Sequence, residues 1–326
     1  DGGAGLLPLS TLSVRIVPPF ILRGGRRLPC KYNRLCLMFP VFWMKWVRGV
    51  LTQGAVMTGS ALILFEAGRR GGLWAAAGAL FALQTALIAV QLPLAQWAGA
   101  LKRRPGGPAG SVVLSGFDAG FSGGYAGLPG LEKHVLPAHW LDALPAESVR
   151  AILLRRPAIL ASGGHLRGVL LAIAWNLGSF ILCAQLPGAG VGRLREFVTT
   201  LMGMTLWSFL GLLLLPSLSR PAVFAAGRAA LAQGAEPEAL RHAIAEIDQW
   251  QEDEPSRGRW LERIFHPVPA AARRLRALEQ PAAGAGGFWH AARLALYLSW
   301  AHFGLLSRAV HCNAGRPELW VLFPGD

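Results

Sequence analysis

Apolar residues in this chain gather into long runs that predict membrane-spanning helices. The clearest run, residues 73–100, is interrupted by three glutamines and exceeds the roughly 20 residues that a helix needs to cross a bilayer. A weaker run, 50–65, precedes it across the short segment 66–72, so the two are predicted to form a hairpin. Two more runs, 169–186 and 197–216, flank a glycine-rich turn and predict a second hairpin. The pattern therefore predicts four membrane spans.

The last apolar stretch, residues 288–310, is interrupted by histidines and arginines and allows two interpretations. It is either a fifth span or a helix that lies at the membrane interface. Its tryptophans and a later one fit an interfacial belt, namely Trp289, Trp300 and Trp320. The alternative is a functional polar face within the membrane, formed by His290, Arg293, His302, His311 and Cys312.

Composition supports a membrane protein and argues against nucleic acid as a partner. Hydrophobic residues make up 53% of the chain and charged residues 15%, whereas a soluble domain has about a quarter charged residues. The net charge of +14 comes mainly from arginines that flank apolar runs, without interleaved aromatic residues. Contact with anionic lipid is therefore the favoured interpretation. The four cysteines lack CxxC spacing, so we expect free thiols.

Basic residues predict which ends of the spans face the cytoplasm. Arginines and lysines precede the first span, and Lys102, Arg103 and Arg104 follow the second, which places both on the cytoplasmic side. Arg69 and Arg70 in the hairpin argue against this orientation. The richness in arginine, alanine and glycine suits a GC-rich bacterial genome. We therefore expect a bacterial inner (cytoplasmic) membrane, with the soluble segments facing the cytoplasm.

The same pattern divides the chain into six parts. These are a basic lead-in (1–48), a transmembrane hairpin (49–100), a first soluble segment (101–168), a second hairpin (169–216), a second soluble segment (217–287) and a C-terminal apolar or interfacial helix with a tail (288–326). The lead-in lacks the pattern of a signal peptide. One interpretation is a natural start near Met38, with the residues before about 38 not native.

Within the first soluble segment, residues 121–173 carry the frame of a zinc-binding helix. The stretch ends in Gly-His-Leu-Arg-Gly at residues 164–168 and resembles the helix AVLAHELAHVKSGHLRG of the integral-membrane metallopeptidases of the HtpX and CAAX prenyl protease family. In that family two histidines one turn apart bind zinc, and the glutamate beside the first histidine activates a water molecule. The resemblance implies a membrane zinc-peptidase fold.

The residues that such chemistry needs are replaced in this chain. In one register, the positions of the first histidine, the glutamate and the second histidine are held by Arg155, Arg156 and Ile159. In a register shifted by one residue they are held by Arg156, Pro157 and Leu160. Neither register supplies a metal ligand or a base, and an arginine there would repel a cation. Pro157 either kinks the helix or begins one.

A second stretch, residues 219–230, matches the family pattern SRxxExxADxxA in the same incomplete way. Val223 stands at the position of the third ligand, a glutamate, and Gly227 at the position of a supporting aspartate. Further similarity at His266 and at residues 273–278 extends the resemblance over about half of the chain. We therefore expect no catalytic residue, no bound metal and no cofactor. A rebuilt zinc site would have to use His134, His139 and His165, which lack ligand spacing.

Together these features predict a mainly α, integral-membrane helical protein. Its metallopeptidase-like helical domain would lie on the cytoplasmic face and be formed by two segments around a transmembrane hairpin. We interpret it as a pseudo-protease that binds a partner or client membrane protein, without cleaving it, in a cavity between helices at 144–164 and 219–233. The alternatives are an active zinc metalloendopeptidase with displaced ligands and a structural subunit of a membrane complex.

Overall fold

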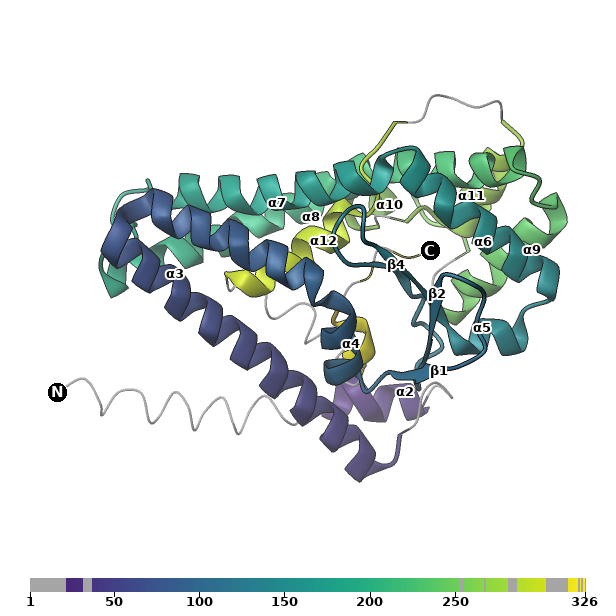
Figure 1. Ribbon diagram of the computed structural model, residues 1–326, viewed down its shortest axis with the longest axis horizontal. Coiled ribbons are helices and arrows are strands. Elements are labelled where there is room, and N and C mark those ends of the chain that lie inside the picture. Colours follow the sequence, from purple (N-terminus) through teal and green to yellow (C-terminus); the bar gives the residue numbers. More distant parts are fainter. Residues whose placement is uncertain are drawn as a thin grey trace.

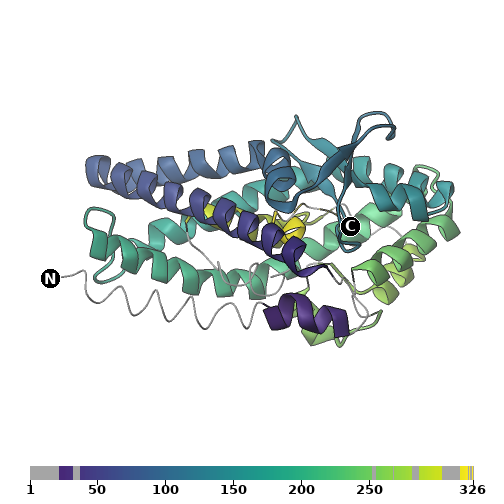
Figure 2. The same cartoon turned by 90° about the horizontal axis from the view of Figure 1, so that it is seen from below.

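A computed structural model describes residues 22–31, 37–251, 255–266, 268–280, 286–302, 316–321, 323 and 325. Most of the predicted lead-in, together with His311 and Cys312, lies outside the described residues. The chain is mainly helical. Two short N-terminal elements, the π-helix η1 (Arg23–Arg27) and α2 (Leu28–Lys31), precede the long helices. Figure 2 shows two helical hairpins extending away from the end that carries a sheet and several short helices.

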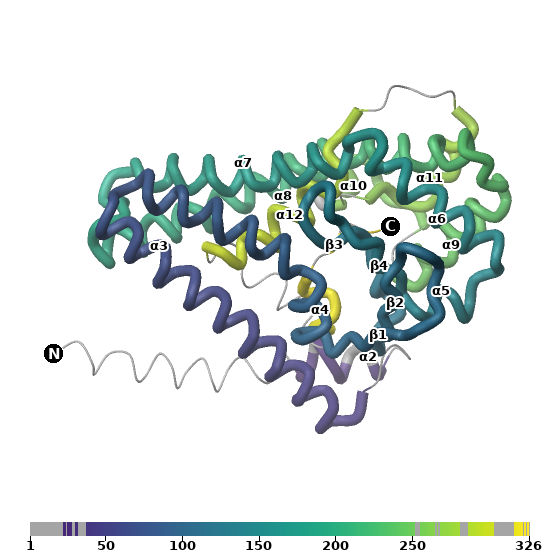
Figure 3. Tube along the Cα trace, viewed as in Figure 1, coloured from purple at the N-terminus to yellow at the C-terminus, as the bar shows by residue number. Residues whose placement is uncertain are grey.

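The first hairpin is formed by α3 (Phe39–Ala89), which folds back on itself (Figure 3). The reversal lies at Gly72, whose φ of 71° and ψ of −165° favour glycine because other residues carry a Cβ that clashes there. This residue ends the predicted turn 66–72. Helix α4 (Gln91–Gly99) continues the second limb toward the sheet (Figure 1). The first two apolar runs thus lie on the two limbs of α3 and on α4.

The second hairpin consists of α7 (Gly164–Cys183) and α8 (Leu194–Ala232). Together with α3, these are the three described helices long and apolar enough to cross a membrane. The tips of the two hairpins touch, since a Cβ at Gly68 would lie 2.6 Å from the Val191 side chain. Helix α8 continues past Pro216, so the expected boundary between span and soluble segment lies inside one unbroken helix.

The other end of the molecule contains a four-stranded sheet that the sequence pattern did not predict. Its strand order is β1 (Lys102–Arg104), β2 (Ser111–Ser115), β4 (Lys133–Pro137) and β3 (Gly124–Ala126). Strands β2 and β4 are parallel, with Val113 opposite Leu136, and β1 and β3 are antiparallel edge strands. Helix α5 (Ala138–Ala143) follows β4 and packs its Trp140 against Val113 and Leu136. The sheet and α5 thereby share one apolar cluster.

The last apolar stretch lies in the interior of the bundle. Its described part forms α12 (Ala291–Leu298) and the 3-10 turn η2 (Ser299–Ala301), which pack against α3, α7 and α8. Trp289, Trp300 and Trp320 are 1%, 2% and 0% exposed. The interfacial interpretation of these tryptophans and of this helix is therefore wrong. The eight residues of α12 are also too few to cross a bilayer.

The expectation of free thiols holds at only one of the two described cysteines. Cys183 on α7 is a free, buried cysteine. Cys30 on α2 is disulfide-bonded, which the spacing of the cysteines in the sequence gave no reason to expect.

Replacing Gly168 with alanine is expected to destabilise the protein by about 1–3 kcal/mol, because overpacking forces neighbouring groups apart. A Cβ at Gly168 would lie 2.1 Å from the Trp289 carbonyl oxygen. Gly178 on the same helix has no atom within 4 Å of such a Cβ, so Gly178→Ala is the matched control. Thermal unfolding of the two variants in detergent tests this. Equal melting temperatures would contradict the close approach of residue 289 to α7.

Candidate functional site

The two helices of the degenerate motif pack directly against each other. Helix α6 (Ala146–Ala161) carries the first motif, and α8 carries the second. They meet in an apolar cluster made of Ile159, Ala222, Val223, Ala226, Val268 and Trp289. Ile159 and Val223, at two positions where the family has ligands, are each 2% exposed and belong to this one cluster. These side chains pack against one another between the two helices, where the sequence predicted a binding cavity.

Trp289 reaches this cluster because the chain before α12 passes between α7 and α8. The backbone N–H of Phe288 donates to the Leu218 carbonyl on α8 at 3.0 Å. The N–H of Trp289 donates to the Gly164 carbonyl at the start of α7 at 3.1 Å. The indole ring then lies beneath Arg155, whose guanidinium carbon is 5.5 Å from the ring centroid, within cation–π range. An aromatic ring thus occupies the interior beside the degenerate helix.

Arg156 ties α6 to the sheet. Its Nη1 donates to the Val135 carbonyl at 2.6 Å, and its Nη2 donates to the Ser122 carbonyl at 2.7 Å. Nη1 also lies 2.9 Å from Nε2 of His134, and the guanidinium stacks over Trp140 at 5.0 Å. The residue is 1% exposed. The side chain that stands where a catalytic base is needed therefore works as a structural anchor.

Positive charge dominates the surroundings of α6. Burial lowers the pKa of Arg155 to about 9, with smaller effects from Arg274 and Arg156. Burial also lowers the pKa of Arg156 to about 10. Both guanidinium groups therefore stay protonated at neutral pH. Arg274 is a third buried cation in this region, and its charge is offset by a buried ion pair with the Asp248 carboxylate.

The remaining positions of the two motifs are also without metal-binding groups. Pro157 is an exposed residue inside α6, so the alternative that a helix begins at Pro157 is wrong. Leu160 is half-buried near the end of the same helix. Gly227 on α8 faces Leu278, since a Cβ there would lie 2.9 Å from the leucine side chain. Gly227 therefore permits close packing of α8 against α11 (Ala271–Leu278).

Of the three alternative histidines, the structure brings two near one another. His134 and His165 each lie 5.6 Å from the ring of Tyr125, whereas His139 lies against Trp250. Burial, aided by the charge of Arg156, lowers the pKa of His134 to about 2, so its imidazole is neutral. With Nε2 facing the Arg156 donor and Nδ1 3.1 Å from the Ser111 hydroxyl, both ring nitrogens of His134 are engaged.

Comparison with solved structures shows what this arrangement resembles. Over 83% of this chain and 74% of the other, the structure matches the crystal structure of S. mikatae Ste24p, with a TM-score of 0.66 and 13% sequence identity. The fold resembles that of Ste24p. No family model and no curated protein sequence matches the chain. The likeness at this identity concerns the fold alone, and three of the described helices are long and apolar enough to cross a membrane.

The resemblance of the two motifs to the metallopeptidase family implies zinc, and the residues at the degenerate positions do not fit that metal. Zinc in proteins is held by cysteine, histidine, aspartate or glutamate side chains. The degenerate positions of the two motifs carry guanidinium and aliphatic groups, which cannot coordinate zinc. Among the described residues, no cluster of three or more histidine, cysteine, aspartate or glutamate side chains has the geometry of a metal site.

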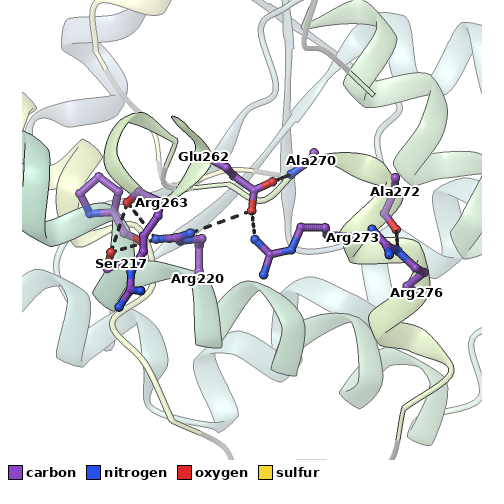
Figure 4. A network of polar contacts seen from close by, with 9 residues as sticks. Ser217, Arg220, Glu262, Arg263, Ala270, Ala272, Arg273 and Arg276 are labelled. Carbon is purple, nitrogen blue, oxygen red and sulfur yellow. Dashed lines mark hydrogen bonds and ion pairs between the residues drawn. The ribbon is translucent and has the colours of Figure 1, made fainter. Parts of the chain in front are cut away.

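The segment that follows α8 contains a buried carboxylate, Glu262, which sequence analysis missed. The segment comprises α9 (Pro237–Trp250), α10 (Arg259–Phe265) and α11. The Glu262 carboxylate, 0% exposed, accepts the N–H of Ala270 at 3.1 Å, pairs with Arg273 and lies 4.0 Å from Arg220 on α8 (Figure 4). Arg220 belongs to the retained Ser-Arg pair of the second motif, so this part of the motif now serves packing.

A cavity of about 210 Å³ lies elsewhere in the structure, between the sheet and the C-terminal segment. On one side it is lined by residues 120–123, which precede β3, and on the other by five C-terminal residues, Arg316, Glu318, Leu319, Val321 and Phe323. Arg293 of α12 and Gln251 complete the lining. The carbonyl of Ser122, to which Arg156 donates, belongs to the same loop as this wall. The cavity therefore neighbours the degenerate helix.

Proposed function

We propose that this protein is a metallopeptidase-like membrane protein that binds polypeptide without hydrolysing it. The observation that carries the proposal is the meeting of α6 and α8 through Ile159, Val223 and Trp289, flanked by Arg155 and an anchored Arg156. Peptide hydrolysis in a zinc peptidase needs a metal-bound water and a carboxylate base beside it. Neither an aliphatic cluster nor a guanidinium group performs either role. Such a scaffold can still bind a polypeptide, which is the step of a peptidase's activity that precedes hydrolysis.

The choice of polypeptide as the bound class rests on the interior of the molecule. The cavity beside residues 120–123 offers backbone groups together with Phe121, and the sheet edge strand β3 follows directly. Backbone groups beside apolar pockets recognise extended chains through main-chain hydrogen bonds and alternate side chains, and here the cavity supplies them, since the three residues of β3 are buried. The apolar helices further favour a membrane protein as the client. We propose a bacterial inner membrane, with the sheet end in the cytoplasm.

Metal content and cleavage, measured on one sample, test the absence of hydrolysis. In detergent-purified protein we expect less than about a tenth of a zinc ion per chain by mass spectrometry, because zinc affinity depends on a complete set of deprotonated ligands. We also expect no chelator-sensitive cleavage of casein, with a zinc metalloprotease such as thermolysin as the positive control for metal retention and cleavage. Stoichiometric zinc with chelator-sensitive cleavage would contradict the proposal. It would instead favour the alternative that uses His134, His139 or His165.

A further inference from the structure

Away from the degenerate motif, helix α8 carries a stripe of exposed apolar side chains. These recur every three or four residues and are Leu206, Phe209, Leu210, Leu213, Leu214 and Leu218. Residues at this spacing share one side of a helix, and α8 is among the described helices that are apolar enough to cross a membrane. The stripe is therefore the lipid-facing side of α8, and it ends at Leu218.

The length of α8 places Ser217 at the edge of the bilayer. The helix rises about 33 Å between the exposed Arg195, near the hairpin tip, and Ser217, which matches a hydrocarbon core of roughly 30 Å. The neighbouring α7 has its boundary at the same level. A Cβ at Gly211 of α8 would lie 2.8 Å from the Trp175 ring of α7, so in this antiparallel pair Ser217 is level with the beginning of α7. A basic residue, Arg167, lies there.

Helix α10 is fixed at this level by hydrogen bonds to α8. The Ser217 hydroxyl donates to the Arg263 carbonyl at 3.2 Å, and the Arg220 guanidinium donates to the same carbonyl at 2.9 Å (Figure 4). On the inner side of α10, the buried Glu262 carboxylate lies 4.0 Å from the Arg220 guanidinium. Helix α10 is therefore held where α8 is expected to leave the hydrocarbon region.

The outer side of α10 combines apolar side chains with positive charge. Trp260 is 74% exposed and Leu261 is 48% exposed. Arg259 and Arg263 are exposed as well, whereas Glu262 is buried on the inner side. Tryptophan side chains favour the headgroup level of a membrane, and basic residues near a membrane surface are attracted to anionic lipids. The outer side of α10 thus has the chemistry of a lipid-binding surface.

From these observations we infer that α10 docks on the membrane surface and binds anionic lipid headgroups through Arg259 and Arg263. Trp260 and Leu261 enter the headgroup layer, where they extend the lipid-facing stripe of α8. The two arginines are complementary in charge to a phosphodiester headgroup. Because Glu262 joins the inner side of α10 to α8 and to α11, docking holds this segment at a fixed height on the bilayer. The inference concerns lipid and does not depend on polypeptide binding.

Hydrogen exchange of residues 255–266, followed by mass spectrometry, tests the docking. The full chain is placed in nanodiscs, one copy in each, with phosphatidylcholine alone or with phosphatidylglycerol added. We expect exchange in α10 to slow at least about fivefold with phosphatidylglycerol, the factor that corresponds to the attraction of one basic residue to an anionic surface. Because the attraction is electrostatic, about 0.5 M salt should remove most of the slowing.

Two variants show which side chains bind the lipid. The double variant Arg259→Ala/Arg263→Ala should lose the slowing that phosphatidylglycerol causes, and Trp260→Ala should exchange faster than the wild type in both lipid mixtures. These side chains are exposed, so both variants should keep the melting temperature of the wild type. The matched control is Arg150→Ala, which removes an exposed arginine of α6 and should respond to phosphatidylglycerol as the wild type does.

The design separates lipid from the other occupants of this surface. Purified lipid and one chain in each disc leave neither a client protein nor a second copy to slow the exchange. The inference is overturned if α10 exchanges equally fast in the two lipid mixtures, or if the double arginine variant keeps the full slowing. It is also overturned if slowing requires two copies in one disc, which would identify a second copy as the occupant. None of these outcomes affects the zinc and cleavage measurements that test the proposed function.

Discussion

Replacing Arg156 with alanine is expected to lower the free energy of unfolding by about 3–5 kcal/mol, because each buried carbonyl left without a donor costs about 1–3 kcal/mol and the lost side chain leaves a cavity. The change would leave the carbonyls of Ser122 and Val135 without their donor and would open a cavity beside Trp140. It would also separate α6 from the sheet, because Arg156 is the residue of α6 that hydrogen-bonds to both the loop before β3 and β4. We expect a fall in melting temperature and early aggregation in detergent.

Two variants make this expectation specific to the contacts of Arg156. Arg150 lies on the same helix with a side chain 69% exposed, so Arg150→Ala should change stability by no more than about 0.5 kcal/mol. Arg156→Lys keeps the charge but loses the forked geometry that reaches two carbonyls at once, and its stability should fall between wild type and Arg156→Ala. If Arg156→Ala has the same melting temperature as the wild type, the arginine has no anchoring role. The proposed conversion of this helix to a structural role would then lose its main support.

The membrane part of the fold was predictable because its signals are local. Long apolar runs and the glycines between them lie within single stretches of sequence, and the reversal at Gly72 falls at the end of the predicted turn. The sheet was missed because its strands are three to five residues long, too short for an alternating pattern to stand out. Moreover, β2 finds its parallel partner in β4, with β3 lying between them in sequence. The resemblance to a helical family gave no reason to search for it.

The sequence predicts which residues belong to the candidate site, but it does not predict the contacts that these residues make. The two motifs indicated that Ile159 and Val223 belong to one site, and the structure places them in one cluster. Trp289 was assigned to a membrane interface, since a tryptophan near the end of an apolar run is typical of one. The partners of Arg156 are backbone carbonyls, which every residue possesses, so no sequence pattern distinguishes them. Contacts of this kind depend on the tertiary arrangement and become visible only in the structure.

Replacing Glu262 with alanine is the second change expected to have a large effect, again of about 3 kcal/mol or more, because it leaves buried cations without their counter-charge. Arg220 would lose the carboxylate 4.0 Å away and keep neutral acceptors alone: the Ser217 hydroxyl and the Arg263 carbonyl, each at 2.9 Å, and the Pro216 carbonyl at 3.4 Å (Figure 4). The N–H of Ala270 would lose its acceptor where the chain enters α11. Helices α10 and α11 should therefore detach from α8, while the apolar hairpins stay folded.

This difference between the two parts of the molecule decides how the Glu262 variants are measured. Limited proteolysis should cut residues 255–280 in Glu262→Ala well before it cuts α3, α7 or α8, whereas Arg156→Ala should expose the sheet first.

Glu262→Gln keeps an acceptor for the Ala270 N–H but loses the negative charge, so its effect on stability should be intermediate. Glu238→Gln is the matched control, because Glu238 is 80% exposed in its pair with Arg241 and surface pairs contribute about 0–1 kcal/mol. Protection of residues 255–280 in Glu262→Ala would show that apolar packing alone holds the second segment on α8. The retained Ser-Arg pair of the motif would then need another explanation.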